Sequence, residues 1–221
     1  MFDYNSTKKF WDKIFIKRGN LKITSPSTGV KELDDSIIWI SDCKRIMDFG
    51  CGNGSMLIRC ALQNDAECLG IDISSEAINT ANEKFKVNKI KDYSFISGGV
   101  EVLDKMEDSS FDGIILYNII DNLHPKDANQ VLKEIKRILK NHGKIILKVN
   151  PYITKEEVKE WNMTLVEKNF YKEESEIYLH NLTTEEWKTY LSGYFIIDKY
   201  IDVYYEKHKR FNRLFYLTNI K

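Results

Sequence analysis

The chain has 221 residues, a length at which one domain buries a full hydrophobic core without needing a disulfide or a metal ion. Its 33 Lys and Arg residues balance 33 Asp and Glu residues, so no whole-chain field attracts a polyanion or an anionic membrane. We therefore expect a single domain, and nucleic acid is disfavoured as a partner without being excluded.

The four cysteines fall within one short stretch, at positions 43, 51, 60 and 68, and lack the C-x-x-C spacing of zinc sites. We predict reduced, mostly buried thiols and no metal site. The first residues carry an acid, Asp3, where a signal peptide would be positive, and no apolar run approaches the roughly 18 residues of a membrane span. The sequence therefore predicts a soluble, cytoplasmic protein without a membrane partner.

In chain order, the apolar pattern predicts a helix around residues 10–15, a turn-rich stretch at 18–29 and a second helix at 30–40. Strands and helices then alternate, with strands expected at 44–49, 67–71, 93–96, 111–117 and 144–149, and helices at 55–63, 74–85 and 127–139. Ser74 is the expected N-cap of its helix, and residues 141–143 are expected to form a loop. This alternation is typical of a doubly wound α/β fold, in which helices cover both faces of a parallel sheet.

The last third of the chain follows another pattern. Residues 150–182 predict a helix and an irregular stretch over the sheet edge, which we interpret as a lid. Thr183 and Glu186 have the spacing of a capping box at the start of a helix, and two aromatic runs at 195–205 and 210–217 predict an antiparallel hairpin. We expect one domain, residues 1–221, made of a helical cap (1–40), a core (41–150), a lid-like insertion (151–182) and a final helix and hairpin (183–221).

A glycine-rich turn follows the first expected strand, with Gly50, Gly52 and Gly54 at alternate positions after Asp48. Such glycines allow positive φ angles and the close approach of a ligand, while the next helix points its N-terminus at the bound group. A nicotinamide site has the spacing G-x-G-x-x-G and holds a pyrophosphate, which Asp48 would repel. The turn therefore favours a cofactor with an uncharged or cationic head group.

The pattern Asp48-x-Gly50-x-Gly52-x-Gly54 resembles the first motif of class I S-adenosylmethionine-dependent methyltransferases, of the small-molecule type related to ubiquinone and menaquinone methyltransferases. The resemblance extends over about residues 40–150. It implies a Rossmann-like, doubly wound, seven-stranded sheet, mostly parallel, with the C-terminal hairpin as the antiparallel part. It also implies that S-adenosylmethionine is the cofactor and S-adenosylhomocysteine the product.

The same resemblance implies a set of cofactor contacts. Asp72, at the end of the second strand, corresponds to the residue that accepts hydrogen bonds from the ribose hydroxyls, and residues 99–101 correspond to the adenine-binding segment. Many relatives have an aspartate where this chain has Gly99, so that contact must come from backbone, Glu101 or water. The expected cofactor-binding residues are Asp48, Gly50, Cys51, Gly52, Asp72, Ile73, Gly99, Val100, Glu101, Tyr117 and Asn118.

Residues for the methyl acceptor are less defined. Tyr117 and Asn118 follow the fourth strand at the carboxyl edge of the sheet, where ligands enter such folds, and should line the cleft. His124 is a candidate general base, or else a structural or cofactor-contacting residue. Trp11 is either a cleft cover or a core anchor, and Tyr152, with other tyrosines of the lid such as Tyr171 and Tyr178, either forms an aromatic pocket or packs.

The function that we predict is transfer of a methyl group to an oxygen, nitrogen or carbon atom of a small molecule. Alignment of the reactants and a dry cleft can supply much of such a rate, with a base needed only if the acceptor must lose a proton, so the lack of an obvious catalytic dyad is no objection. A protein or RNA acceptor is an alternative, for which the local basic residues Lys207, Lys209, Arg210 and Arg213 are the hint. A nicotinamide oxidoreductase and a silent cofactor-binding protein are further alternatives. The sequence does not identify the acceptor or the oligomeric state.

Overall fold

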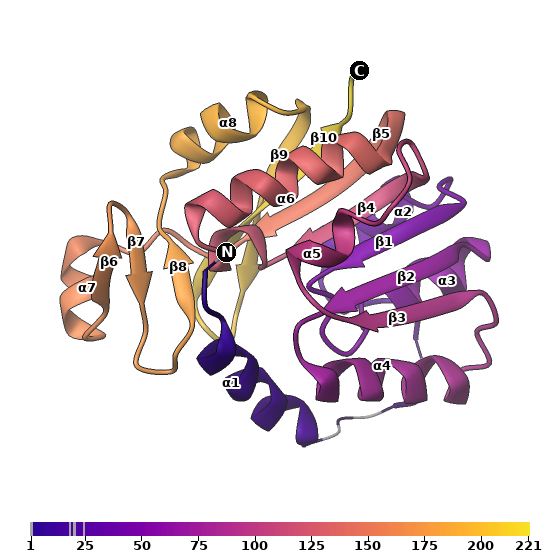
Figure 1. Cartoon of the computed structure of the whole chain (residues 1–221), viewed down its shortest axis with the longest axis horizontal. Coiled ribbons are helices and arrows are strands. Elements are labelled where there is room, and N and C mark those ends of the chain that lie inside the picture. The colour runs from indigo at the N-terminus through magenta and orange to yellow at the C-terminus, as the bar shows by residue number, and fades with distance from the viewer. Residues whose placement is uncertain (1, 18, 20, 24) are drawn as a thin grey trace.

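The computed structural model describes residues 2–17, 19, 21–23 and 25–221 (Figure 1). Met1, and Arg18, Asn20 and Thr24 of the predicted turn-rich stretch, lie outside the described residues.

The helices are α1 Asn5–Ile16, α2 Lys31–Trp39, α3 Leu57–Asn64, α4 Ser75–Val87, α5 Val100–Leu103, the 3₁₀ turn η1 Ile120–Asn122, α6 Pro125–Ile138, α7 Lys155–Glu160 and α8 Thr184–Ser192. The strands are β1 Arg45–Phe49, β2 Glu67–Asp72, β3 Tyr93–Ser97, β4 Phe111–Tyr117, β5 Leu139–Val149, β6 Thr164–Glu167, β7 Phe170–Lys172, β8 Tyr178–His180, β9 Ile196–Tyr205 and β10 Arg210–Thr218.

Seven strands form the main sheet in the order β3-β2-β1-β4-β5-β10-β9. The first five are parallel, β10 is antiparallel to β5, and β9 is antiparallel to β10. This topology confirms the predicted α/β fold, a mostly parallel seven-stranded sheet with an antiparallel C-terminal hairpin. The carboxyl ends of the parallel strands therefore meet at one edge, where ligands bind in open α/β sheets.

The core lies on both faces of this sheet, because neighbouring residues of a strand point to opposite sides. On β4, Ile114 and Leu116 pack with residues of α6 and α8, whereas Ile115 packs with residues of α2 and α3. All three side chains are fully buried. Figure 1 shows α6 running across β4 and β5 on one face. The double-sided burial explains why these strands have nearly continuous apolar sequences.

Capping residues begin the helices where the sequence predicted. The Ser74 hydroxyl accepts a hydrogen bond from the Ala77 amide at 3.1 Å, and Thr183 and Glu186 form a reciprocal capping box at the start of α8. Each arrangement satisfies amide donors that the first helical turn leaves without a backbone partner. The two predicted helix starts are confirmed.

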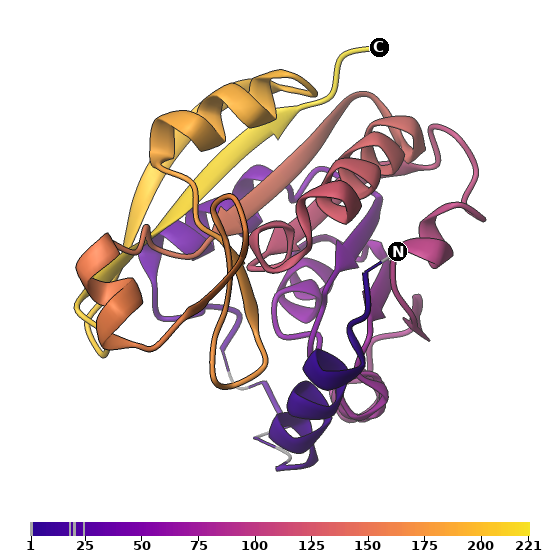
Figure 2. The same ribbon diagram turned by 60° about the vertical axis from the view of Figure 1, so that its left-hand side comes forward.

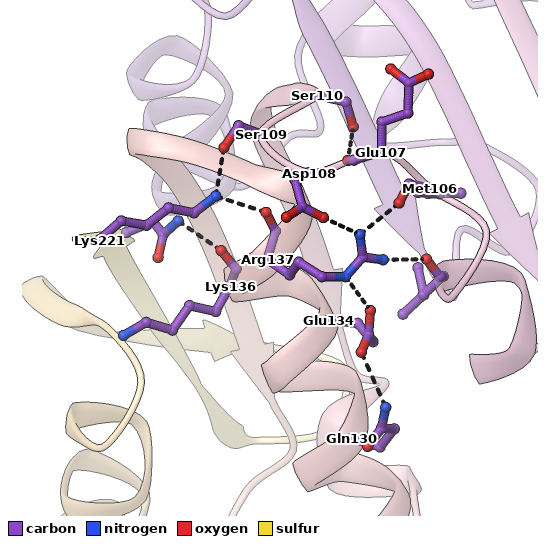
Figure 3. A network of polar contacts seen from close by, with 12 residues as sticks. Met106, Glu107, Asp108, Ser109, Ser110, Gln130, Glu134, Lys136, Arg137 and Lys221 are labelled. Atoms are coloured by element: carbon purple, nitrogen blue, oxygen red, sulfur yellow. Dashed lines mark hydrogen bonds and ion pairs between the residues drawn. The ribbon is translucent and has the colours of Figure 1, made fainter.

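A second set of contacts fixes the segment between α5 and β4 against α6 (Figure 3). The Arg137 guanidinium donates to the carbonyl oxygens of Leu103 and Met106 at 3.0 and 2.7 Å, and it pairs with Asp108 at 2.6 Å and Glu134 at 2.7 Å. These bonds hold the end of α5, which begins one residue after Gly99. They thereby help to position the loop that is expected to contact the cofactor.

The prediction of a loop at residues 141–143 is wrong. These residues belong to β5, which starts at Leu139, directly after α6. The reason is a distant contact: Asn219, just after β10, donates from its side chain to the carbonyls of Lys136, Leu139 and Lys140, and the His142 amide donates to the Asn219 carbonyl. The C-terminal segment thus satisfies the carbonyl groups at the end of α6 and extends the ladder.

The irregular stretch expected within residues 150–182 is also wrong. After α7, the chain forms a small antiparallel sheet in the order β6-β7-β8. Its strands have only three or four residues, too few for a period of two to be recognised in the sequence. Figures 1 and 2 show this sheet beside the main sheet and close to α1, consistent with the 2.9 Å hydrogen bond from the Thr7 hydroxyl to the Glu176 carbonyl.

Within the described part of the chain, no helix combines the length and apolarity that crossing a bilayer requires. The four cysteines are buried free thiols. The cytoplasmic location and the division into cap, core, lid and hairpin stay predictions.

Candidate active site

A cavity of about 730 Å³ lies at the carboxyl edge of the main sheet. Its floor is formed by residues at or just after the ends of β1 to β5, and its other walls come from α1, the segment between β5 and β8, and the turn between β9 and β10. The predicted site residues that line it are Trp11, Gly50, Gly52, Asp72, Ile73, Gly99, Val100, Glu101, Tyr117 and Asn118. The fold thus brings most of the expected site together, although their roles stay predictions.

The glycine-rich turn has the backbone geometry that its sequence suggests. Gly50, Gly52 and Gly54 have φ angles of 77°, 51° and 70°, in the left-handed region. The amides of Gly50 and Cys51 donate to the Ile71 carbonyl at 2.8 and 3.0 Å. A Cβ atom at Gly50 would lie 2.8 Å from Ile119, so both the conformation and the space require glycine there.

Asp72 lines the cavity at the end of β2 and is held by two backbone amides. Its Oδ2 accepts from the Gly52 amide at 2.8 Å and its Oδ1 accepts from the Ser74 amide at 2.8 Å. Burial raises the pKa of Asp72, and these two backbone hydrogen bonds oppose that shift. Each carboxylate oxygen keeps a further lone pair, so Asp72 can still accept hydrogen bonds from two ligand hydroxyl groups.

Asp48 and Cys51 are placed outside the lining of the cavity. Asp48 is 3% exposed and its Oδ1 has no hydrogen-bond partner among the described residues. Burial, and then the nearby Asp72 carboxylate, raise the pKa of Asp48 well above its ordinary value. The Cys51 thiol is also buried, which raises its pKa. Neither side chain lines the cavity in this structure, and the cofactor contacts expected of Asp48 and Cys51 stay predictions.

The segment expected to hold adenine lines the cavity through Gly99, Val100 and Glu101. The Glu101 Oε1 accepts from the Gly99 amide at 2.8 Å, so its carboxylate folds back over the start of α5. Because Gly99 has no side chain, the Glu101 carboxylate is the acidic group that lies beside it.

At the other end of the cavity, the polar groups of Asn118 are fixed by neighbours. Asn118 has a φ of 52°, its Oδ1 accepts from the Lys148 ammonium at 2.5 Å, and its Nδ2 donates to the Asn150 Oδ1 at 2.9 Å. The Tyr117 hydroxyl lies 2.7 Å from the Ser36 hydroxyl, and burial raises the pKa of Tyr117. Tyr117 therefore presents its ring rather than a phenolate to this region.

His124 does not line the cavity, which argues against the predicted role as general base. Its Nδ1 accepts from the Lys126 amide at 3.2 Å and so caps α6, while its Nε2 lies 3.3 Å from Glu167. Its ring stacks on Phe2, with centroids 4.9 Å apart. Both nitrogen atoms are thus engaged in structural contacts.

Tyr152 is likewise placed outside the main cavity. It is 42% exposed and lines a second, open hollow of about 670 Å³ between α7 and the β9–β10 turn. Trp11, by contrast, lines the main cavity from α1, as the cleft-cover interpretation expects.

Sequence reasoning missed the residues that distant segments contribute to the walls. These are Tyr4, Thr7, Lys8 and Phe15 of the N-terminal segment, Ile153, Trp161, Glu173, Ile177 and Leu179 of the lid, and His208 and Asn212 of the hairpin. Tyr178, one of the candidate aromatic residues, also lines the cavity. One usable signal was present: Asn212 is a lone amide within an aromatic strand and is 8% exposed. A buried amide in such a strand needs polar partners.

The family model described as "Methyltransferase domain" matches residues 40–193. The 27-O-demethylrifamycin SV methyltransferase of Amycolatopsis mediterranei is 32% identical over 107 residues, which are 47% of this chain and 37% of that protein. The tRNA N(3)-methylcytidine methyltransferase trm140 of Schizosaccharomyces pombe is 22% identical over 191 residues, 81% of this chain and 61% of that protein. The chain thus spans less than two thirds of either relative.

Among solved structures, the 1,6-didemethyltoxoflavin-N1-methyltransferase of Burkholderia thailandensis has a TM-score of 0.69 at 12% identity, covering 100% of this chain and 92% of its own. That crystal structure contains 1,6-didemethyltoxoflavin and S-adenosylhomocysteine. At this identity the likeness establishes the fold.

Proposed function

The chain belongs to the methyltransferase domain family, and on that premise we propose that it transfers a methyl group from S-adenosylmethionine to a small-molecule nucleophile. It is a class I S-adenosylmethionine-dependent methyltransferase, with S-adenosylmethionine as its cofactor. This membership opposes the nicotinamide oxidoreductase considered above. The observation that carries the choice of acceptor is the covered cavity.

The residues at the cavity floor fit this cofactor. Asp72 offers carboxylate oxygens to the ribose hydroxyls, and Ile73 and Val100 offer apolar surface to the adenine ring. Gly50 and Gly52 line the cavity with backbone alone, and the Ile119 and Phe15 side chains lie against them. When bound, the cofactor supplies a methyl group already activated by a sulfonium. The protein is then left to orient the acceptor and to exclude water.

The cover over the cavity favours a small acceptor. Phe2 packs edge-on against the ring of Tyr178 at 5.0 Å, and Thr7 is bonded to Glu176, so the N-terminal segment is attached to the lid. A volume of about 730 Å³ lies within the range of roughly 300 to 1,000 Å³ typical of small-ligand pockets. A cofactor and a modest acceptor are therefore the expected occupants.

The basic residues near the C-terminus give little support to an RNA acceptor. Arg213 is 3% exposed, and its guanidinium donates to the carbonyls of Asn150 and Leu182. Arg210 pairs with Glu157 at 2.8 Å. Two of the four cations are therefore engaged within the protein and would not neutralise phosphates. The similarity to the tRNA methyltransferase is the observation that favours RNA as the second candidate.

A labelling experiment separates the two candidates. The protein would be incubated with methyl-tritiated S-adenosylmethionine and, in parallel, with the low-molecular-weight, RNA and protein fractions of a cell extract. We expect label in the small-molecule fraction, absent with Asp72→Ala. Label in RNA or protein would contradict the proposed acceptor class, and no transfer to any fraction would favour a silent binding protein.

A further inference from the structure

Four asparagine residues that line the cavity are joined through their side chains to one buried lysine. The Lys148 Nζ donates to the Asn118 Oδ1, the Asn118 Nδ2 donates to the Asn150 Oδ1, and the Asn150 Nδ2 donates to the Asn122 Oδ1, over 2.5, 2.9 and 3.2 Å. The Asn212 Nδ2 lies 3.5 Å from the same Asn118 Oδ1. Asn118, Asn122, Asn150 and Asn212 reach the cavity, whereas Lys148 is 7% exposed and lies behind them.

The direction of every bond in this chain follows from the lysine. An ammonium group only donates, so the oxygen of the Asn118 amide must face Lys148 and its nitrogen must face Asn150. The Asn150 amide then has its oxygen engaged and can only donate to Asn122. A reversed Asn212 amide would bring two oxygen atoms together, so its nitrogen faces Asn118. One buried cation thus sets the orientation of amides that are ambiguous in isolation.

The backbone around the chain is held as firmly as the side chains. The Asn150 amide donates to the Asp121 Oδ2 at 2.7 Å, and the Arg213 guanidinium donates to the Asn150 carbonyl. The Asn118 amide donates to the Lys148 carbonyl at 2.7 Å. These contacts preorganise the amide groups before a ligand enters.

Two atoms at the ends of the chain are left for a ligand. Among the described residues, the Asn122 Nδ2 and the Asn212 Oδ1 have no hydrogen-bond partner. Neither atom is fully buried. They therefore keep access to the cavity. One is a donor and the other an acceptor, and both are neutral.

We propose that Lys148 is a positioning residue that orients this asparagine chain, and that the acceptor end of the cavity thereby selects a neutral molecule with hydrogen-bonding groups. The inference rests on the proposed function, since it concerns the acceptor of the same site. Aromatic surface from Trp161 and Tyr178 completes the wall, so a polar aromatic compound suits it.

The charged groups packed directly against the asparagine chain, Lys148, Asp121 and Arg213, are engaged within the protein. Arg210, which also lines the cavity, pairs with Glu157 at 2.8 Å. The Lys148 ammonium lies 5.3 and 5.5 Å from the ring centres of Tyr117 and Tyr205, and the buried Asp121 carboxylate acts on it. Arg213 is occupied by backbone carbonyls. A carboxylate or ammonium on the acceptor would thus be desolvated without a matching partner among these groups, which is unfavourable.

The test uses three matched phenols on protein saturated with S-adenosylhomocysteine: 4-hydroxybenzamide, 4-hydroxybenzoate and 4-hydroxybenzylamine. They share a ring and a hydroxyl and differ in the charge of the para group. Binding would be measured by calorimetry for the wild type, Lys148→Met and Asn118→Asp. Lys144→Met is the matched control, because Lys144 is on the same strand and contacts Asp42 and Trp39 away from the cavity.

We expect the wild type and Lys144→Met to bind the neutral amide about tenfold more tightly than either ion, a ratio equal to the loss of about one hydrogen bond. Lys148→Met should lose that preference, because without the ammonium the side-chain amides of the asparagine chain can adopt the reversed orientation. It should still bind S-adenosylhomocysteine normally. Asn118→Asp should lose it too, although it keeps the lysine contact, because it cannot donate to Asn150. A purely structural role of Lys148 would weaken all three phenols alike.

Several outcomes would overturn the proposal: a preference for either ion, no binding of any of the three phenols, or an unchanged preference in Lys148→Met. Failure of the wild type to bind S-adenosylhomocysteine would instead refute the proposed function. Thermal unfolding of each variant identifies any that is not folded, and the second variant then decides.

Discussion

The two halves of the cavity are built in different ways. The half that we propose to hold the cofactor, the cofactor half, consists of loops that directly follow β1, β2 and β3. In it, Asp72 accepts a hydrogen bond from the neighbouring Gly52 amide. The acceptor half takes side chains from segments far apart in the chain, as the bond between Thr7 and Glu176 illustrates. The first half is thus a property of the parallel sheet, whereas the second depends on how separate elements pack.

This difference implies that a change in one half should leave the other largely intact. The cofactor half should tolerate little, because the proposed function makes its backbone conformation the binding surface. The acceptor half depends on orientation of side chains, which conservative changes can alter without unfolding the protein. The following substitutions test that separation.

The largest effect is expected from Gly50→Ala. It introduces a Cβ atom 2.8 Å from Ile119 at a φ of 77°, so strain and overpacking together should destabilise the protein by on the order of 2–4 kcal/mol. Calorimetry should detect no binding of S-adenosylhomocysteine, and urea unfolding should give the stability loss. Gly19→Ala is the control, because a Cβ atom there meets nothing within 4 Å. Normal cofactor binding by Gly50→Ala would contradict the assigned turn.

A pH-dependent effect is expected from Lys148 in the acceptor half. Burial lowers the pKa of Lys148 to about 8, below the value of 10.5 that it has when unfolded. Above pH 8 the folded state releases this proton before the unfolded state does, so the penalty of burying the charge is relieved as pH rises. The unfolding free energy of the wild type should therefore gain about 1–2 kcal/mol relative to Lys148→Met between pH 7 and 9.5.

The comparison with Lys148→Met cancels the titration of the remaining groups, including Lys84, whose pKa burial also lowers to about 8. Urea denaturation at several pH values gives the difference in unfolding free energy between the wild type and Lys148→Met. If that difference stays constant with pH, burial of the Lys148 ammonium does not destabilise the folded protein.

A smaller effect is expected from Arg210→Ala, which detaches the lid from the hairpin. Arg210 pairs with Glu157, donates to the Tyr152 carbonyl at 3.3 Å and lies 4.8 Å from the centre of the Trp161 ring. Loss of a partly exposed ion pair and a cation–π contact amounts to about 1 kcal/mol. Hydrogen exchange in α7 should accelerate about fivefold, while S-adenosylhomocysteine binding stays unchanged. The neighbouring variant Lys209→Ala is the control and should exchange as slowly as the wild type. Equally slow exchange in Arg210→Ala would argue against this attachment.

The smallest effect is expected from His124→Ala. The ring caps α6 through a 3.2 Å bond, so its loss should lower the unfolding free energy by about 0.5 kcal/mol. Methyl transfer and its pH profile should not change, because the side chain lies outside the cavity lining. A large loss of turnover in a folded, cofactor-binding variant would restore His124 as a candidate base.

The same contrast explains what the sequence could predict. Alternating strands and helices, the Ser74 cap and the glycine turn depend on residues close in sequence, so the sheet and the cofactor half were predictable. The ladder extension through Asn219 and the strands β6 to β8 depend on tertiary contacts, which no local pattern contains. For the site, residue types at the end of β1 indicated a cofactor turn, but not that Asp48 would lie beneath it.

The acceptor half shows the limit most clearly. Lys148 and Asn212 look unremarkable in the sequence, one in an apolar strand and the other in an aromatic strand. Only the pairing of β5 with β10 brings them to the same asparagine. Polar residues inside otherwise apolar strands were the available signal, and they indicate a buried network without naming its partners.

The central claim is that the cavity floor holds S-adenosylmethionine through Asp72. Calorimetric titration with S-adenosylhomocysteine and with NADH, on the wild type, Asp72→Ala and the control Asp198→Ala, tests it most directly, because Asp198 is an exposed residue bonded to Thr218 on the hairpin. We predict that the wild type and the control bind S-adenosylhomocysteine and not NADH, and that Asp72→Ala binds at least about tenfold more weakly, since it loses hydrogen bonds to a charged group. Unchanged binding by Asp72→Ala, or a preference for NADH, would contradict the account.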